Sequence, residues 1–398
     1  MERKNENKYF EQFDGARGLL AFSIFILHLH FTYIKVPSTL ANFTLHSFFV
    51  ASAYLITTIL LRDKQKYVAF GSFFKQFYIK RILRIFPVYF GYIFVVLVLA
   101  ILHKMILRHD LVGVLTEFKQ YGYMLMTFTY NFKDLYCITQ GDNSIASSNL
   151  FPHLWSISME EQFYIIIPFL IYFLSVKSLR ILSICCILLF PIIRIVGYEW
   201  LKSISDNNLL IGFTMIRSSV FQFDAFFYGI LMAVLPPLNL KQIRRLFYLS
   251  VGLLIFQDIV NVLIIQSEYN IPAFEMISRY DIYAMNGAAR YIDVLLNISC
   301  FAFLYLVFNT QNEFPLLLNN RLVEYGKFSF GSYVYQYIFI LPSYYLLFKT
   351  LEIYLPVFVA ELISAIICLV CIIQFSKWSY YRFELKFIKM KDYFLKKI

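Results

Sequence analysis

Long apolar runs separated by short polar segments dominate the chain. A transmembrane helix needs about 20 predominantly apolar residues to cross a hydrocarbon core of about 30 Å. The pattern therefore predicts an all-α protein, a polytopic bundle of about ten membrane helices that forms a single domain over residues 1–398. The ten predicted spans are residues 15–33, 45–61, 86–106, 160–176, 179–198, 218–236, 246–266, 291–309, 328–348 and 356–376.

The run near residues 112–132 is ambiguous because it contains polar residues such as Glu117, Lys119 and Asn131. If this run does not span and the N-terminus is inside, 24 of the 36 Lys and Arg residues lie on the inner side, nine lie on the outer side and three lie within spans. If the run does span, the basic segments after residue 177 change sides and this bias collapses. The sequence therefore predicts two cytoplasmic termini and a long outer loop at about residues 107–159.

Composition supports a membrane protein and excludes several other classes. The chain is 60% hydrophobic and 20% aromatic, with a mean hydropathy of +0.63, which is not typical of a soluble protein. The net charge of +11 lies in loops between apolar runs, so it indicates membrane orientation and no nucleic-acid partner. Five of the six Cys residues lie in apolar runs, so neither a disulfide framework nor a metal site is predicted. The N-terminus is not typical of a cleavable signal peptide.

The first apolar run contains three ionisable residues, Asp14, Arg17 and His28. Arg17 and His28 are eleven residues apart, which on an α-helix is about 20° past three full turns and about 16 Å along the axis. Both side chains therefore leave the same face, and Asp14 lies one turn before Arg17, where the two can pair. Ionisable side chains inside a membrane helix usually face a protein interior or a wet cavity. An interfacial Arg with an unrelated core His is the alternative interpretation.

A basic cluster precedes the third predicted span, with Pro87 at the start of that span. Arg81 and Arg84 share one face of a helix, and Lys80 lies beside them. Guanidinium groups bind phosphate through two parallel hydrogen bonds, so a cytoplasmic cluster of this kind suits a polyanion. An anchor to anionic lipid is the alternative.

Two adjacent carboxylates, Glu160 and Glu161, stand at the predicted outer mouth of the fourth span. Ser158 is placed to cap this helix, with both carboxylates in its favourable first turn. Adjacent helical residues diverge by about 100°, so at most one of the two carboxylates points toward His28.

Further ionisable residues fall in the outer half of the predicted bundle. Arg194 lies in the fifth span, and Arg217 and Asp224 lie near the start of the sixth. Structural ion pairs between helices would explain them. Their shared depth with His28 and Glu160 instead favours one polar pocket within the outer half of the membrane.

Taken together, these segments resemble the acyltransferase 3 family of integral membrane acyltransferases. The resemblance covers nearly the whole chain in order, and the ordered set is more specific than any one motif. The matching pieces are Phe13–Gly18 with His28, Phe48–Ser52 with Leu55–Thr57, Arg81–Ile85 with Pro87, His153–Ser156 with Glu160–Tyr164, Asp224 with Gly229, Ser329–Phe330 with Tyr333, and Tyr381–Glu384.

What the resemblance implies is transfer of an acyl group, often acetyl, from cytoplasmic acyl-CoA to a sugar hydroxyl. His28 would be the catalytic imidazole, as a general base or a transient acyl carrier. Arg17 would orient groups or stabilise charge, and Glu160 or Glu161 would orient His28 or the acceptor.

The resemblance also implies binding roles and a location. Arg81 and Arg84, with Lys80, would hold the phosphates of acyl-CoA, which is a donor substrate and not a tightly bound cofactor. The bacterial cytoplasmic membrane is the implied location, with lipid, acyl-CoA and a glycan or lipid-linked saccharide as partners. The residues assigned to substrate binding are Asp14, Tyr164, Arg194 and Asp224.

The chain departs from the family pattern at several positions. Ala53 replaces a common Gly, the acidic residue that is common before Phe48 is absent, and Gln336 stands where the family usually has His. Gln forms hydrogen bonds but carries no proton at neutral pH, so the role of this position is open. A transporter or flippase of a lipid-linked saccharide, or an assembly subunit for polysaccharide export, are the competing hypotheses.

Overall fold

The computed structural model describes residues 2–29, 38–67, 69–142, 150–269, 292–310 and 314–395, and these ranges contain helices and no β-strand. The α-helices are α1 (Glu2–His28), α2 (Ser38–Lys66), α3 (Phe70–Leu107), α4 (Val114–Met126), α5 (Lys133–Thr139), α6 (Leu154–Phe173), α7 (Val176–Ile204), α8 (Asn208–Arg217), α9 (Ser219–Gln222), α10 (Asp224–Val234), α11 (Leu240–Tyr269), α14 (Ile292–Asn309), α15 (Asn320–Lys327), α16 (Ser329–Pro342), α17 (Lys349–Leu351), α18 (Val357–Ser379) and α19 (Leu385–Leu395). The short 3₁₀ turns are η1 (Leu111–Gly113), η2 (Tyr130–Phe132) and η4 (Pro315–Leu318), and the π-helical turns are η5 (Ser343–Phe348) and η6 (Tyr380–Glu384).

The all-α fold predicted from the apolar pattern is confirmed, and the number of spans is confirmed in part. Among the described residues, six helices are long and apolar enough to cross a membrane. They are Thr39–Lys66, Phe70–Leu107, Leu154–Phe173, Val176–Ile204, Leu240–Ile264 and Val357–Leu395. The predicted span 218–236 is divided between α9 and the 11-residue α10, and the predicted span 328–348 between the 14-residue α16 and η5. The total of ten stays a prediction.

Helix α3 joins the basic cluster directly to the third predicted span. It has 38 residues, so it is about 57 Å long, and Pro87 lies inside it. Pro87, at the start of the third predicted span, therefore lies inside a helix that begins at Phe70. Lys, Arg, Ile and Leu between residues 79 and 85 sustain the helix before the proline, and membrane helices tolerate an internal proline. Arg81 and Arg84 thus have the fixed orientation of helical residues.

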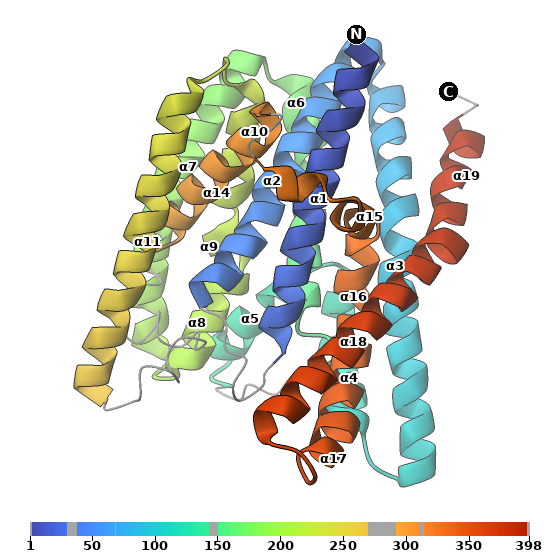
Figure 1. Cartoon of the computed structure of the whole chain (residues 1–398). Coiled ribbons are helices and arrows are strands. Elements are labelled where there is room, and N and C mark those ends of the chain that lie inside the picture. Colours follow the sequence, from blue (N-terminus) through green and yellow to red (C-terminus); the bar gives the residue numbers. More distant parts are fainter. Residues whose placement is uncertain are drawn as a thin grey trace.

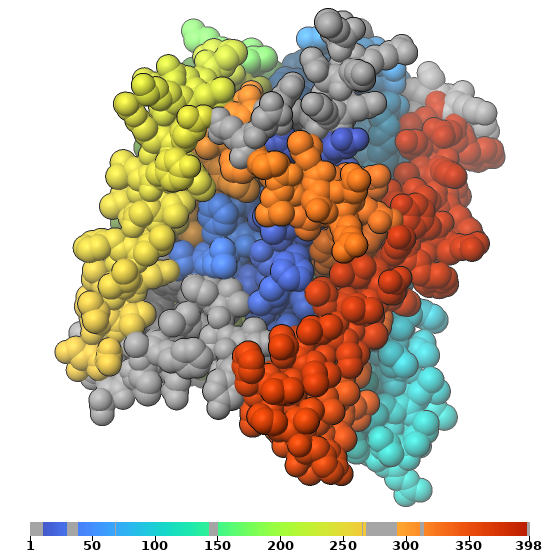
Figure 2. All heavy atoms as spheres, viewed as in Figure 1, coloured from blue at the N-terminus to red at the C-terminus, as the bar shows by residue number. Residues whose placement is uncertain are grey.

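Long helices flank a central pair in the bundle (Figure 1). Helices α7 and α11 lie on one side of α1 and α2, and α3, α18 and α19 lie on the other. Figure 2 shows α11 in yellow and α18 and α19 in red at opposite edges of one face, with blue atoms of α1 and α2 between them. Helix α1 begins and α19 ends at the same end of the bundle. The cytoplasmic location of the termini stays a prediction.

Three glycines bring α1 into backbone contact with η4 and α15. A Cβ added to Gly326 would lie 1.8 Å from the backbone oxygen of Asp14, and one added to Gly15 would lie 1.7 Å from that of Leu317. A Cβ at Gly18 would lie 2.3 Å from the backbone oxygen of Leu322. Only glycine permits so close a crossing, which is how small residues pack membrane helices. This contact fixes the helix segment that carries Asp14 and Arg17.

The largest apolar cluster joins α2, α3, α6, α10 and α16. Within it the rings of Phe163 and Phe226 stack with centroids 4.5 Å apart, and Phe49 lies 5.0 Å from Phe226. A Cβ at Gly229 would lie 2.3 Å from the backbone oxygen of Val50, so α10 and α2 are also in close contact. Aromatic packing and this close approach hold α2 against α6, where the polar residues described below face each other.

The segment between α3 and α6 is built from short helices. Helix α4 has 13 residues and is about 20 Å long, which is shorter than the hydrocarbon core of about 30 Å. Lys133 and Glu117 form a buried ion pair with an N–O distance of 2.6 Å that ties α5 to α4. The side-chain amide of Gln162 donates to Asn131, which ties η2 to α6. Within residues 108–142 and 150–153, the described part of this segment, no single helix is long enough to cross the membrane.

Candidate active site

A cavity of about 340 Å³ lies inside the bundle, between α1, α2, α3, α6 and α16. Its ionisable lining residues come from four of these helices. They are Asp14 and Arg17 from α1, Arg81 and Arg84 from α3, Glu160 and Tyr164 from α6, and Tyr333 from α16. Most of the remaining lining is apolar, so the charged groups face one another in a space of low polarity.

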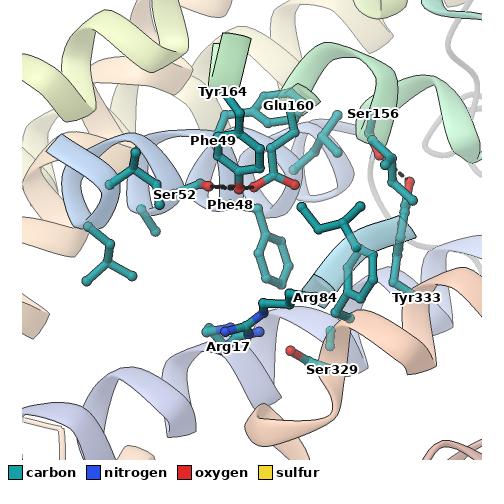
Figure 3. A pocket seen from close by; sticks show the side chains of 18 of the residues that line it. Arg17, Phe48, Phe49, Ser52, Arg84, Ser156, Glu160, Tyr164, Ser329 and Tyr333 are labelled. Atoms are coloured by element: carbon teal, nitrogen blue, oxygen red, sulfur yellow. Dashed lines mark hydrogen bonds between the residues drawn. The ribbon is translucent and has the colours of Figure 1, made fainter. Parts of the chain in front are cut away.

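One wall of the cavity is cationic. Arg17 and Arg84 lie together on it (Figure 3), and Asp14 lies 3.6 Å from Arg17. The guanidinium of Arg81 lies 5.2 Å from the ring centroid of Tyr164, a cation–π contact. Within the described part of the chain, neither Arg81 nor Arg84 forms a salt bridge with a carboxylate. The wall therefore presents guanidinium groups that are available to an anionic ligand.

The opposite wall is built from a carboxylate and two hydroxyl groups. Ser52 Oγ donates to Glu160 Oε1 over 2.5 Å, and the Tyr164 hydroxyl donates to the same oxygen over 2.5 Å. The oxygens of Ser52 and Tyr164 are 2.7 Å apart. Figure 3 shows these three side chains together, facing Arg17 and Arg84 across the cavity.

Tyr333 and Ser156 form the end of the cavity toward α16. Their hydroxyl oxygens are 2.6 Å apart, and Tyr333 also donates to the backbone oxygen of His153 over 2.6 Å. His153 is buried, and its Nε2 donates to the backbone oxygen of Val334 over 2.9 Å. Helices α6 and α16 are thus joined by polar contacts at the edge of the cavity.

His28 lies beyond Tyr333 and is not part of the cavity lining. Its Nδ1 is 3.1 Å from Oε1 of Gln336, and its ring lies 6.4 Å from that of Tyr333 and 5.2 Å from that of Tyr337. Arg17 and His28 do belong to one helix, but their separation of about 16 Å along the axis lets only Arg17 reach the cavity. The catalytic role of His28 stays a prediction.

The two adjacent carboxylates have different surroundings. Glu160 lines the cavity, whereas Glu161 is buried beside it, and its Oε1 has no hydrogen-bond partner among the described residues. The prediction that Ser158 caps the helix is wrong, because α6 begins at Leu154 and Ser158 donates to the backbone oxygen of Leu154. Glu160 is therefore about 9 Å inside α6, at the depth of the arginines and not at an outer mouth.

The predicted outer pocket is divided into separate clusters. Arg194 is fully buried, and its two terminal nitrogens each lie 2.9 Å from an oxygen of Asp224. Asp293 lies 3.9 Å from Arg194, and His46 lies 3.8 Å from Asp293. Arg194 and Asp224, which were assigned to substrate binding, contact each other and do not line the cavity.

Two other predicted residues also have partners outside the cavity. Arg217 donates to Asp134 over 2.9 Å, which joins α8 to α5. Lys80 lies 3.9 Å from Asp63 and is not part of the cavity lining, so the two arginines of the basic cluster, and not the lysine, reach the cavity.

Ser52 and Tyr333 were recognised in the motifs but were not predicted as site residues. The small residues beside Ser52, Ala51 and Ala53, are typical of a surface for close helix packing and so do not by themselves indicate a site. A polar hydroxyl inside an apolar run that also contains Phe48 and Phe49 was the available signal. Its partner, Glu160, is 108 positions away, so the spacing within α2 could not reveal the contact.

The fold and the cavity define a multi-pass helical membrane protein with a charged internal site. The chain belongs to the acyltransferase 3 family, because the family model, described as an acyltransferase domain, matches residues 10–374. The resemblance noted in the motifs and the enzyme class that it implied, an acyltransferase, are thereby confirmed.

Curated relatives match a part of the chain. Peptidoglycan O-acetyltransferase OatA of Listeria monocytogenes is 31% identical over 179 residues, 44% of this chain and 26% of that protein. Putative peptidoglycan O-acetyltransferase YrhL of Bacillus subtilis is 28% identical over 174 residues, 42% of this chain and 24% of that protein. A putative O-acetyltransferase of Staphylococcus aureus is 30% identical over 168 residues, 40% of this chain and 24% of that protein. The matches thus span about a quarter of each relative, and no solved structure matches the chain.

Proposed function

We propose that the protein is a membrane O-acyltransferase that moves an acyl group, most simply acetyl, from cytoplasmic acyl-CoA to a hydroxyl of a cell-surface glycan or a lipid-linked saccharide. The cavity carries this proposal, because guanidinium groups on one wall face a carboxylate and hydroxyl groups on the other. Such a site suits a substrate that has both an anionic part and a reacting carbonyl. The names of the relatives, which are O-acetyltransferases, support acetyl as the acyl group.

The cationic wall supports acyl-CoA as the donor. Acyl-CoA carries phosphate groups, and Arg binds phosphate through paired N–H donors. Arg81 and Arg84 leave the same face of α3, and Arg81 is held in place by its contact with Tyr164. The phosphates would bind to these arginines, and the pantetheine arm would lead the thioester toward Glu160.

His28 would be the base for the acceptor hydroxyl. With Nδ1 donating to the amide oxygen of Gln336, Nε2 of the neutral ring carries the lone pair that accepts a proton. A sugar hydroxyl holds its proton far above neutral pH, so attack on a thioester needs such a base. Arg17, on the same helix, would stabilise negative charge that develops on the thioester oxygen.

The proposal includes the topology of ten spans with both termini in the cytoplasm. This arrangement gives the excess of 24 Lys and Arg residues inside over nine outside. A cysteine placed at the exposed Gln140 should react with a membrane-impermeant maleimide added to intact cells, above the labelling of the parent chain. Reaction only after the cells are opened would contradict the topology.

The function is tested by measuring O-acetyl groups on the surface glycans of cells with and without the protein. Cells that carry the His28→Asn variant should accumulate the protein normally and lose glycan O-acetylation by at least about 10²-fold, because Asn keeps some hydrogen bonding but no basicity. His103→Asn is the matched control, because His103 lies at the end of α3 and contacts His109.

Two results would contradict the proposal. Full acetylation with His28→Asn would remove His28 as the base. Unchanged glycans in cells without the protein, together with a lipid-linked saccharide that stays on the inner leaflet, would favour a flippase.

A further inference from the structure

Ser52, Glu160 and Tyr164 form a cluster that the proton transfer at His28 does not use. All three line the cavity, and the three oxygens are within 2.5 to 2.7 Å of one another. The cluster joins α2 to α6 on the wall opposite Arg17 and Arg84 (Figure 3). A carboxylate with two hydroxyl groups in contact, open to a cavity, is a catalytic arrangement as well as a structural one.

Two hydroxyl groups of α2, those of Ser52 and Thr39, donate to a carboxylate of another helix; Ser52 lines the cavity, whereas Thr39, which donates to Asp258 over 2.5 Å, does not. Thr44 and Thr58 each donate to the backbone oxygen four residues earlier, at 2.9 Å from Leu40 and 2.8 Å from Tyr54. This is the usual way in which a hydroxyl is satisfied on an apolar helix. Ser52 instead donates across to a carboxylate of another helix, so its proton is directed toward a base.

The protons of the cluster favour Ser52 as the nucleophile. The three contacts share two hydroxyl protons when Glu160 is ionised. Ser52 and Tyr164 each donate to Glu160 Oε1, so the Ser52 proton is directed to the carboxylate; once Glu160 has taken that proton, the Tyr164 hydroxyl, 2.7 Å away, can turn to donate to Ser52 Oγ and stabilise negative charge there. A hydroxyl hydrogen-bonded to a carboxylate base, with a second hydroxyl in contact with its oxygen, is the geometry of an activated nucleophile.

We propose that Ser52 is the acyl carrier of the transfer reaction, in an inference that rests on the proposed function. In the first step Ser52 Oγ attacks the thioester carbon of acyl-CoA. The bond between Oγ and the acyl carbon forms, the bond between carbon and sulfur breaks, CoA leaves as a thiolate, and Glu160 keeps the Ser52 proton. The guanidinium groups across the cavity stabilise the oxyanion.

In the second step the acceptor hydroxyl attacks the ester carbon. Its proton goes to His28, the bond between the acyl carbon and Ser52 Oγ breaks, and Glu160 returns its proton to Ser52. The proton on His28 passes to solvent and balances the thiolate released in the first step. In this order of steps Glu160 accepts the proton of Ser52, and His28, beyond Tyr333, accepts the proton of the acceptor hydroxyl. The acyl donor and the acceptor occupy the cavity one after the other.

The test is to trap the ester on the full chain in lipid nanodiscs. The protein is mixed with acetyl-CoA that carries a radiolabelled acetyl group, with no acceptor, and quenched in acid. We expect a burst of thiol on the order of one per chain and an acetyl ester on the peptide that contains Ser52. Ser52→Ala should abolish both and lower transfer to acceptor by about 10²-fold or more. Glu160→Gln should slow the burst, and His28→Asn should keep it.

Ser47→Ala is the matched control, because Ser47 is a buried serine of α2 that contacts Cys300 and not the cavity. It should keep the burst, the ester and the transfer. Transfer at the parental rate by Ser52→Ala, a label on another side chain, or transfer by the unmodified chain without a trapped ester would each overturn the carrier role and leave the proposed function intact. If the unmodified chain releases no thiol when an acceptor is present, the acyl-CoA donor itself is wrong, and the carrier role fails with it.

Discussion

The contact between His28 and Gln336 makes a specific prediction about catalysis. Gln336 is 2% exposed, and its amide oxygen lies 3.1 Å from His28 Nδ1. The Gln336→Leu variant keeps a similar size and removes the oxygen. The imidazole then loses the partner that fixes its tautomer and that would stabilise its positive charge after proton transfer.

The size of the effect follows from the type of hydrogen bond. A hydrogen bond to a charged group contributes about 1.5–3 kcal/mol net. His28 becomes charged only when it takes the acceptor proton, so this contribution appears in the transition state and not in donor binding. At about 1.4 kcal/mol per tenfold change, Gln336→Leu should lower kcat about 10- to 150-fold. The KM for acyl-CoA should stay the same.

The assay measures kcat and KM of the purified chain in nanodiscs, with acetyl-CoA and a soluble glycan acceptor. Gln336→Glu keeps an acceptor oxygen and should restore most of kcat. Tyr335→Phe is the structural control, because Tyr335 lies beside Gln336 on α16 and its hydroxyl makes a buried contact of 2.9 Å to Ser379 of α18. Removing this hydroxyl should lower thermal stability without lowering kcat. A Gln336→Leu variant with parental kcat, or one whose losses match those of Tyr335→Phe, would refute a positioning role for Gln336.

Two other residues give sharp expectations. Arg84→Lys should raise the KM for acetyl-CoA about tenfold, because Lys lacks the paired N–H groups that match phosphate. Lys75→Ala, at an exposed position of the same helix, is the control and should leave this KM unchanged. An unchanged KM in Arg84→Lys would show that the Arg84 guanidinium does not bind acyl-CoA. Gly326→Ala should destabilise the detergent-solubilised protein by about 1–3 kcal/mol, because its Cβ would meet the Asp14 backbone at 1.8 Å. Gly252→Ala, whose Cβ would meet no atom within 4 Å, is the control, and equal melting temperatures for the two would contradict the close crossing of α1 and α15.

The sequence predicted most of the charged residues at the cavity. Arg17, Arg81, Arg84 and Glu160 were recognised because a charge beside an apolar helix usually has a partner or a cavity. Their shared depth could not be predicted. Glu160 was expected in the outer half and the two arginines of α3 on the inner side, because the start of α6 was predicted six residues too late. Apolar content defines the core of a span better than its ends.

Contacts between distant helices were also beyond the sequence pattern. Helical periodicity gives the angle between two residues of one helix, and α1 does contain both Arg17 and His28. Periodicity does not predict how one helix is rotated about its axis relative to its neighbour. The contact between Ser52 and Glu160 depends on that rotation of α2 relative to α6. The stack of Phe163 on Phe226 and the approach of Gly229 to Val50 set it. These are packing events that appear only when the whole bundle is assembled.

The two groups of buried charges show why membership of a motif does not define a site. Burying an ion costs several kcal/mol unless a partner offsets it. Around Arg194 the offset is internal, because Asp224 binds both terminal nitrogens and Asn297 donates to the same carboxylate over 3.2 Å. At Arg81 and Arg84 no carboxylate of the described chain completes the pair. The charges around Arg194 therefore neutralise one another and hold helices together. At Arg81 and Arg84 the cost of burying the guanidinium groups is not offset by a carboxylate, so a bound anionic substrate would offset it. The ligand that best completes such a wall is an anion, and this is the physical reason to place the donor there.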